Sequence, residues 1–377
     1  MELSFLLYFT LFVVLSCWQY IDFKLRKDTK VCSSLFIMIK TYPIVFFIII
    51  VGFRYNVGGD FPTYEEYYVD QFFVSDSSQV AYEFGFYTLI EILHFFSLPS
   101  QSLFVICSIF QVVLLLKIVQ IAKGSGLLLI FFYFTTLSFI ESLNVMRQSI
   151  ALLGVILALY YLANKKYKYS ILNTMVAVIF HSSSLLAIPL MFLLYKSSLY
   201  KYRYTIILFT LLSHFFAVQF FSFFVDMVLE LPIFGGYSGY LAFSKDLFIE
   251  NVNDGISIGL ILSLLTDVYL IIRGTKFIAM NSRSLPSVVF NSYLIGCLIY
   301  PIVASTGFLA LGRGMMYFYG MKFVVMSAVL YAGFKSGSIL ERKGVILTPI
   351  VLLYLLWFCM AVYIGAAGSS PYQSYWG

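Results

Sequence analysis

Apolar stretches long enough to cross a lipid bilayer recur along the whole chain, and they constrain its fold more than any other feature. A helix needs about 20 mostly apolar residues to span roughly 30 Å of hydrocarbon. The stretches that approach this length are 3–20, 33–53, 101–121, 125–141, 148–164, 203–225, 256–272, 287–307, 314–333 and 345–365. The sequence therefore predicts an all-α, polytopic membrane protein with about ten transmembrane helices, folded as a single domain over residues 1–377.

The composition supports a membrane protein and excludes several function classes. Only 11% of the residues are charged, against about 25% in soluble proteins, and the mean hydropathy is +0.92. A soluble fold this apolar could not cover its surface, so cytosolic enzymes, nucleic-acid-binding proteins and secreted disulfide scaffolds do not fit. The 5 cysteines are scattered without a C-x-x-C pair, and the 3 histidines are dispersed. We expect no metal and no cofactor.

Basic residues predict the orientation, because short cytoplasmic loops are enriched in Lys and Arg. Most of the 24 basic residues fall in clusters near 24–30, 117–123, 165–168, 196–203, 273–283 and 335–343. Placing all these clusters in the cytoplasm leaves both termini outside. Arg54, Arg147 and Arg313 then lie at the outer ends of spans, against the usual trend. These three arginines are the most informative exception to the rule that basic residues lie on the cytoplasmic side.

Residues 169–195 lie between two basic clusters, so they must cross the membrane an even number of times or not at all. A hairpin of two short helices, 169–180 and 183–195, with His181 at its outer tip, satisfies this requirement. A single tilted span over the same residues is the alternative, and it would invert the orientation of everything downstream. We favour the hairpin.

Two large polar segments, 54–100 and 226–254, face outward in this threading, so we expect the working face to be the outer one. The first includes a predicted amphipathic helix over 83–97, which would lie at the membrane interface or plug a wet cavity. One stripe of this helix is polar and consists of Glu83, Tyr87, Glu91 and His94.

The segment GFRYNVGGDFPTYEEYY, residues 52–68, begins where the second span leaves the membrane. A flexible Gly-Gly turn separates Arg54 from Asp60, and such a turn lets backbone amides and a guanidinium approach an anion. The guanidinium suits phosphate because it is planar, always charged and able to donate two parallel hydrogen bonds. The alternative is an Arg54 that reaches toward lipid headgroups, paired with Asp60.

The other two outward arginines also have polar or glycine-rich surroundings. Arg147 forms a patch with Asn144 and Gln148 at the mouth of the fifth span. Arg313 stands between two glycines, and Tyr317 follows one helical turn later. Each arginine alone could anchor the topology, but three of them together favour an anion site.

Several further residues have two interpretations each. His181 could be a base at the tip of the hairpin or a core histidine bonded to a neighbouring helix. Tyr64 and other outer tyrosines could stack on sugar rings or belong to the aromatic girdle of the membrane. Lys322 and Asp267 lie within spans and could form a pair or line a cavity.

An outward-facing membrane enzyme has no supply of ATP or nucleotide sugars, so its activated donor must arrive in the membrane. Polyprenyl diphosphates are such donors in bacteria. A diphosphate leaving group develops negative charge, which positioned arginines stabilise in the transition state. Three outer arginines meet that need without a metal, and the sequence has no D-x-D pair to hold one.

The order of these motifs resembles the signature of the EpsG-like branch of the Wzy polysaccharide polymerases. The matching residues are Arg54, Gly58, Asp60 and Tyr64, then Arg147-Gln148 before an apolar helix, then Phe180-His181-Ser182. Arg313 with Tyr317, and the closing PYQSYW from Pro371, are similar to the C-terminal pattern of that family. Gly59 stands where family members often have Thr or Ser. The resemblance spans nearly the whole chain.

The resemblance implies a GT-C-like glycosyltransferase of the bacterial inner membrane that works on the periplasmic face. It would polymerise O-antigen or exopolysaccharide repeat units carried on undecaprenyl diphosphate. The growing chain would move from its lipid carrier onto the non-reducing-end hydroxyl of an incoming unit, so a lipid-linked oligosaccharide is both donor and acceptor. Membrane lipid, and a flippase and a chain-length regulator of the same pathway, are the other expected partners.

Residue roles follow from this hypothesis. Arg147 and Arg313 would bind the diphosphate, with Arg54 assisting or orienting the donor. The candidate bases are, in order of reach, Asp60, Glu83 and His181. The residues expected to line the substrate are Tyr64, Gln148 and Tyr317. The alternatives are a ligase that transfers finished glycan to lipid A core, a membrane acyltransferase, and a transporter or flippase. A transporter predicts inverted repeats, and we find none in the sequence.

Overall fold

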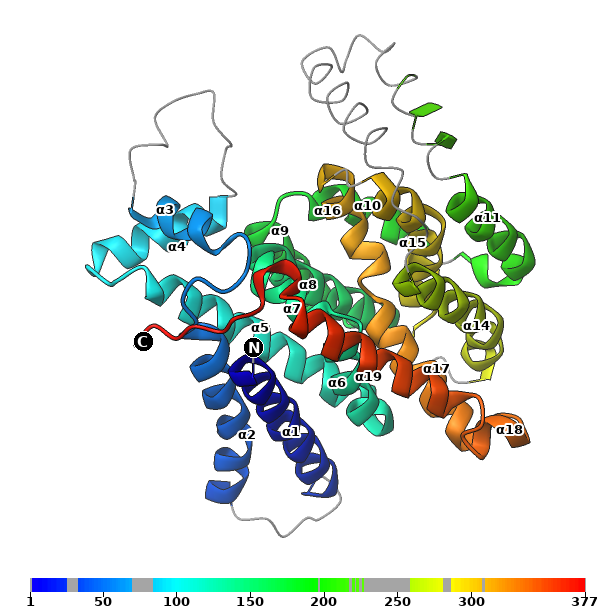
Figure 1. Ribbon diagram of the computed structural model, residues 1–377, viewed down its shortest axis with the longest axis horizontal. Coiled ribbons are helices and arrows are strands. Elements are labelled where there is room, and N and C mark those ends of the chain that lie inside the picture. Colours follow the sequence, from blue (N-terminus) through cyan, green and yellow to red (C-terminus); the bar gives the residue numbers. More distant parts are fainter. Residues whose placement is uncertain are drawn as a thin grey trace.

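A computed structural model describes residues 2–25, 33–69, 84–195, 197–216, 219–220, 222–223, 226, 258–280, 286–306 and 309–376, and helices form almost all of these segments (Figure 1). The N-terminal half contains α1 (Glu2–Leu25), α2 (Ser33–Phe47), the π-helical turn η1 (Ile48–Gly52), α3 (Phe61–Val69), α4 (Phe84–Phe95), α5 (Gln101–Ala122), η3 (Lys123–Ser125), α6 (Gly126–Thr135), α7 (Ser138–Asn144), α8 (Met146–Ala163), α9 (Tyr167–Phe180) and α10 (Ser184–Leu194). The C-terminal half contains η4 (Leu199–Tyr202), α11 (Arg203–Phe215), α14 (Ile258–Met280), α15 (Ser287–Thr306), α16 (Leu309–Tyr319), α17 (Lys322–Ser336), α18 (Ile339–Arg342), α19 (Leu347–Tyr363) and η6 (Ala366–Gly368).

In the described residues, four stretches are both long and apolar enough to cross a membrane. They are Glu2–Leu25, Gln101–Thr135, Met146–Ala163 and Gly314–Ser336. Shorter apolar helices accompany them at Thr41–Gly52, Phe84–Phe95, Ser287–Ile302 and Leu347–Tyr363. The structure therefore shows a helical, multi-pass membrane protein, while a total of ten spans stays a prediction.

Two of the predicted spans are divided in the structure. The stretch 125–141 becomes α6 and α7, because Leu137 takes a left-handed conformation with φ of 65°. The stretch 314–333 runs from α16 into α17 through a turn at Gly320 and Met321. The chain turns at each break, and side chains of neighbouring helices pack together there.

The hairpin over 169–195 is present as α9 and α10. His181 separates them in an extended conformation, with φ of −155° and ψ of 110°, which a single continuous span would not allow. α9 runs antiparallel to α8, and the Ser170 hydroxyl donates to the Ala158 carbonyl at 2.9 Å. Gly154 permits the close approach, since a Cβ there would lie 3.1 Å from the Asn173 carbonyl oxygen.

Both termini meet at one end of the bundle. The Tyr8 hydroxyl donates to the Ser369 carbonyl at 2.6 Å, and the Tyr372 amide donates to the Ser4 hydroxyl at 2.7 Å. In Figure 1 the red C-terminal segment accordingly passes close to the N-terminus, on the side of α3 and α4.

Basic clusters meet at the opposite end. Arg203 donates to the Thr275 hydroxyl, Gln19 donates to the Lys123 carbonyl, and Arg273 forms a salt bridge with Glu341. These contacts join the segments 196–203, 273–283 and 335–343 to one another and bring Lys123 beside α1.

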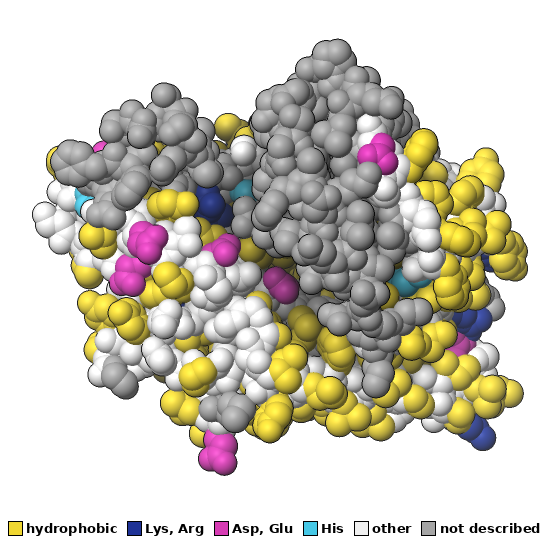
Figure 2. Space-filling model, turned by 45° about the horizontal axis from the view of Figure 1, so that its top comes forward, with side chains coloured by type: hydrophobic (Ala, Val, Ile, Leu, Met, Phe, Trp, Pro, Cys, Tyr) yellow, Lys and Arg dark blue, Asp and Glu magenta, His cyan; other side chains and the backbone are white. Residues whose placement is uncertain are grey.

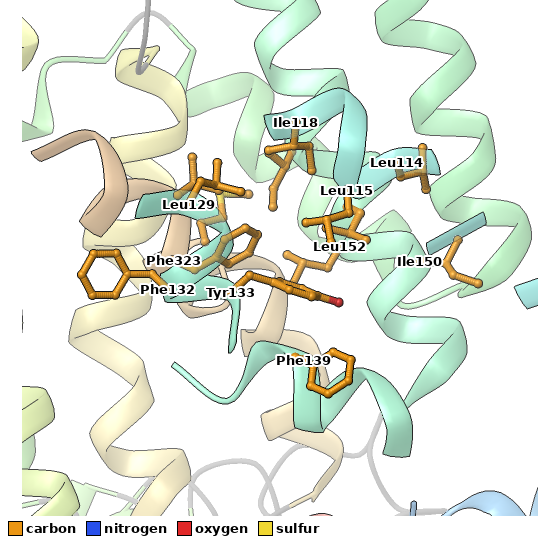
Figure 3. Close-up of a cluster of buried hydrophobic side chains, with 14 of the residues drawn as sticks. Leu114, Leu115, Ile118, Leu129, Phe132, Tyr133, Phe139, Ile150, Leu152 and Phe323 are labelled. Carbon is orange, nitrogen blue, oxygen red and sulfur yellow. The ribbon is translucent and has the colours of Figure 1, made fainter. Parts of the chain in front are cut away.

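The core joins α5, α6, α7, α8 and α17 (Figure 3). Tyr133 lies at its centre, with its ring centroid 5.5 Å from that of Phe323 and 6.2 Å from that of Phe139. Leu115, Leu152 and the other labelled side chains fill the space around these rings. This packing fixes the corner between α7 and α8, from which Arg147 projects.

Candidate functional site

The loop after the second membrane stretch, residues 53–60, is held by main-chain contacts of Arg54. This side chain is 0% exposed. Its guanidinium donates to the carbonyls of Val57 and Leu143, both at 3.1 Å, and of Val51, and it approaches the Met146 sulfur. Burial lowers the pKa of Arg54 to about 10, so it stays charged at neutral pH. Arg54 thus fastens this loop to the α7–α8 corner.

Other elements fasten the same loop from two sides. Gln101 at the start of α5 donates to the carbonyls of Gly52 and Arg54. The C-terminal tail pairs with the loop through an isolated antiparallel bridge between Arg54 and Ser374. Trp376 stacks on Phe53 with ring centroids 4.5 Å apart. The PYQSYW segment therefore has a structural role in supporting the loop.

The Gly-Gly turn fits directly against the α7–α8 corner. Gly58 has φ of 99°, and a Cβ there would lie 2.2 Å from the Leu143 carbonyl oxygen. The Asn144 side chain accepts a hydrogen bond from the Asp60 amide at 2.7 Å. Asp60 and the end of α7 are consequently held together at this end of the bundle.

Arg147, the second residue of α8, lies between two aromatic rings. Its guanidinium carbon is 5.4 Å from the centre of the Tyr64 ring on α3 and 4.9 Å from that of Phe86 on α4. Burial raises the pKa of the Tyr64 hydroxyl, whereas the charge of Arg147 and a hydrogen bond with it oppose that shift. Arg147 itself is only half-buried, so its charge reaches the surface of this end.

His181 lies at the same end as Arg147. Because α8 and α9 are antiparallel and Gly154 lies against Ala177, His181 falls beside the first turn of α8. Gly85 on α4 approaches Ile179 closely, which brings Phe86 to the same place. The two predicted site residues on the hairpin and on α8 are thus brought to one end of the molecule.

α16 reaches this place from the C-terminal half. Tyr317 is 0% exposed, and the Ser183 hydroxyl donates to its hydroxyl at 3.4 Å. Arg313 lies one turn earlier in the same helix, about 6 Å along its axis at 1.5 Å per residue. The structure describes the backbone of Arg313 but not its side chain, so its place in a common anion site stays a prediction.

Glu141 is a site residue that the sequence analysis missed. It lies on α7, three residues before Asn144 and thus on the same helical face. Its side chain is exposed, and partial desolvation followed by the charge of Asp60 raises the pKa of Glu141. Figure 2 looks toward this end and shows acidic side chains, a basic side chain and a histidine at the surface beside the residues in grey.

The remaining predicted site residues have different surroundings. Gln148 is buried within α8, so it can contribute to the site only from beneath Arg147. Glu83 lies outside the described residues. The predicted amphipathic helix is present as α4, with Phe86, Ile90 and Leu93 buried. His94 stacks on Tyr68, with ring centroids 4.2 Å apart, and a ring nitrogen of His94 lies 2.7 Å from the Tyr68 carbonyl oxygen.

Asp267 and Lys322 form the pair that the sequence left open. The Lys322 ammonium lies 2.7 Å from one Asp267 oxygen, and both side chains are buried. The hydroxyls of Tyr293 and Tyr319 donate to the Asp267 carboxylate at 2.6 and 2.8 Å. This cluster lies where α16 passes into α17, so it fixes the turn that follows α16.

Across the part of the chain that the structure describes, three or more metal-ligating side chains nowhere gather closely enough to hold an ion. What the site does contain is a half-buried guanidinium, a pair of acidic residues and a histidine at one end of a helical membrane bundle. These features give one end of the membrane bundle both a positive charge and groups that can accept a proton.

The chain belongs to the EpsG family, whose model matches residues 37–374. This is a family of Wzy-like polymerases, which makes the protein a polymerase-type glycosyltransferase of polysaccharide synthesis in the membrane. Comparisons with curated proteins and with solved structures find no match.

Proposed function

We propose that this protein polymerises undecaprenyl-diphosphate-linked oligosaccharide units at the periplasmic face of the bacterial inner membrane. The observation that carries the proposal is the position of Arg147, half-buried against two aromatic rings in the first turn of α8. The amino end of a helix adds positive potential where an anion would bind. The contacts that gather the basic clusters at the other end support a cytoplasmic position for that end.

In this proposal the diphosphate of the donor is the leaving group. Arg147 stabilises the negative charge that develops on it, and Arg313 contributes a second guanidinium from α16. Arg54 assists indirectly by holding the loop that carries Asp60, since its donors are occupied by main-chain carbonyls. Tyr64 and Tyr317 line the substrate from α3 and α16, and Gln148 supports Arg147 from within α8.

The acceptor hydroxyl needs a base at the same end of the bundle. Asp60 and His181 lie at that end, and Glu83 directly precedes α4. The flippase and the chain-length regulator of the pathway would deliver the units and limit the product, and the surrounding lipid would carry both substrates.

A glycan gel from a deletion strain tests this function. We expect the ladder of surface polysaccharide to collapse to a single-unit band, and the wild-type gene to restore it. An Arg147→Gln variant should give the single band at normal protein level, while Arg203→Gln, at the opposite end, should give the full ladder. A complete loss of surface glycan would indicate a transporter. Long chains left on the lipid carrier would indicate a ligase, and either result would overturn the proposal.

A further inference from the structure

Glu141 and Asp60 are two acidic residues held at one place by separate elements. The Asn144 side chain accepts the Asp60 amide at 2.7 Å, and Glu141 precedes Asn144 by one turn of α7. Gly58 brings the loop against Leu143, the neighbour of Asn144. The two residues therefore lie near each other at this end of the bundle, close enough for the charge of Asp60 to act on Glu141, although 80 residues separate them in the sequence.

Asp60 acts on the environment of Glu141. The Glu141 side chain is exposed, and partial desolvation together with the charge of Asp60 raises the pKa of Glu141. A negative neighbour makes a carboxylate a better proton acceptor, so the charge of Asp60 favours Glu141 as the group that takes up a proton. A further titratable group that the charge of Glu141 reaches is Tyr300 on α15.

We propose that Glu141 is the residue that accepts the proton of the acceptor hydroxyl, with Asp60 as its acidic neighbour. This assignment rests on the proposed polymerase function and chooses a base that the sequence did not indicate. Glu141 is suited to the role because it is accessible, lies on a helix fixed by the core and stands six residues before Arg147.

The step balances without any additional reactant. The acceptor hydroxyl gives its proton to the Glu141 carboxylate, and the acceptor oxygen forms a bond to C1 of the donor sugar. The bond between C1 and the diphosphate oxygen breaks, and its electron pair stays on the diphosphate beside Arg147. The proton then leaves Glu141 for water, and the products are the lengthened chain and the free lipid diphosphate.

The test uses purified full-length protein in liposomes with a lipid-linked repeat unit. We expect Glu141→Gln to lower kcat by roughly 10²–10⁴-fold with little change in KM. Glu66→Gln, an exposed acidic residue on α3 at the same end, is the matched control and should keep the wild-type rate. Equal melting temperatures of the variants and the wild type show that each is folded.

The pH profile separates Glu141 from Asp60 as the base. The wild-type kcat should fall as the pH drops through the raised pKa of Glu141, because the protonated carboxyl cannot accept a proton. Asp60→Asn removes a negative neighbour and should move this acid limb to lower pH. A wild-type rate for Glu141→Gln, or loss of all transfer in Asp60→Asn with an active Glu141→Gln, would overturn the assignment. A wild-type protein that joins no units at all would instead contradict the polymerase function.

Discussion

Replacing Arg54 separates a supporting role from direct contact with substrate. Arg54→Met would leave the carbonyls of Val51, Val57 and Leu143 without their donor in a site closed to water. An unsatisfied buried acceptor costs about 1–3 kcal/mol. Removing the buried charge relieves part of that cost, because burial of a charge is itself unfavourable. We therefore expect a net destabilisation of about 2–4 kcal/mol.

The assay is equilibrium unfolding of the detergent-purified protein, run beside a polymerisation assay. Arg54→Lys should lie between the wild type and Arg54→Met, since an ammonium keeps the charge but loses the planar fork. Arg147→Met provides the contrast, because it should lose activity with a much smaller change in stability. An Arg54→Met protein as stable as the wild type and yet inactive would refute this reasoning and assign Arg54 a direct contact with substrate.

Two further substitutions test the supports around the site. Gly58→Ala should destabilise the protein by about 2 kcal/mol or more, since a Cβ meets the Leu143 carbonyl oxygen at 2.2 Å and φ is 99°. The control is Gly314→Ala in α16, where a Cβ has no atom within 4 Å, and it should unfold at no lower denaturant concentration than the wild type. Lys322→Met should lower the free energy of unfolding by about 3–5 kcal/mol, because it leaves Asp267 without its cation. Adding Asp267→Asn should recover part of this stability, as measured by thermal melting. Full additivity of the two changes would contradict the pairing.

Hydropathy and charge were enough to predict much of the architecture. The apolar stretches predicted helices such as α5, α8 and α19, because a lipid environment allows few alternatives to a helix. The basic residues on both sides of 169–195 predicted the α9–α10 hairpin around His181. For a lysine and an aspartate within apolar spans, the sequence left open whether they pair or line a cavity, and the structure pairs Lys322 with Asp267.

The environment of the site residues could not be predicted in the same way. Arg54 was expected near an anion, but three of its acceptors are main-chain carbonyls, one of them 89 residues away at Leu143. Carbonyl positions depend on tertiary packing and have no sequence signature. Glu141 was missed for a related reason, because its neighbour Asp60 comes from a distant loop. The left-handed Leu137 that divides α6 from α7 also has no local signal, since leucine rarely takes that conformation.

Arg147 is proposed to stabilise the diphosphate leaving group at the end of the bundle that holds both termini. The rate of chain elongation by purified Arg147→Ala and Arg147→Lys proteins in liposomes measures this role most directly, with Arg203→Ala as the control from the opposite end. We expect Arg147→Ala to lower kcat by roughly 10²–10³-fold, Arg147→Lys to retain part of the rate and Arg203→Ala to match the wild type. Elongation by Arg147→Ala at the wild-type rate would contradict a role of Arg147 in stabilising the leaving group.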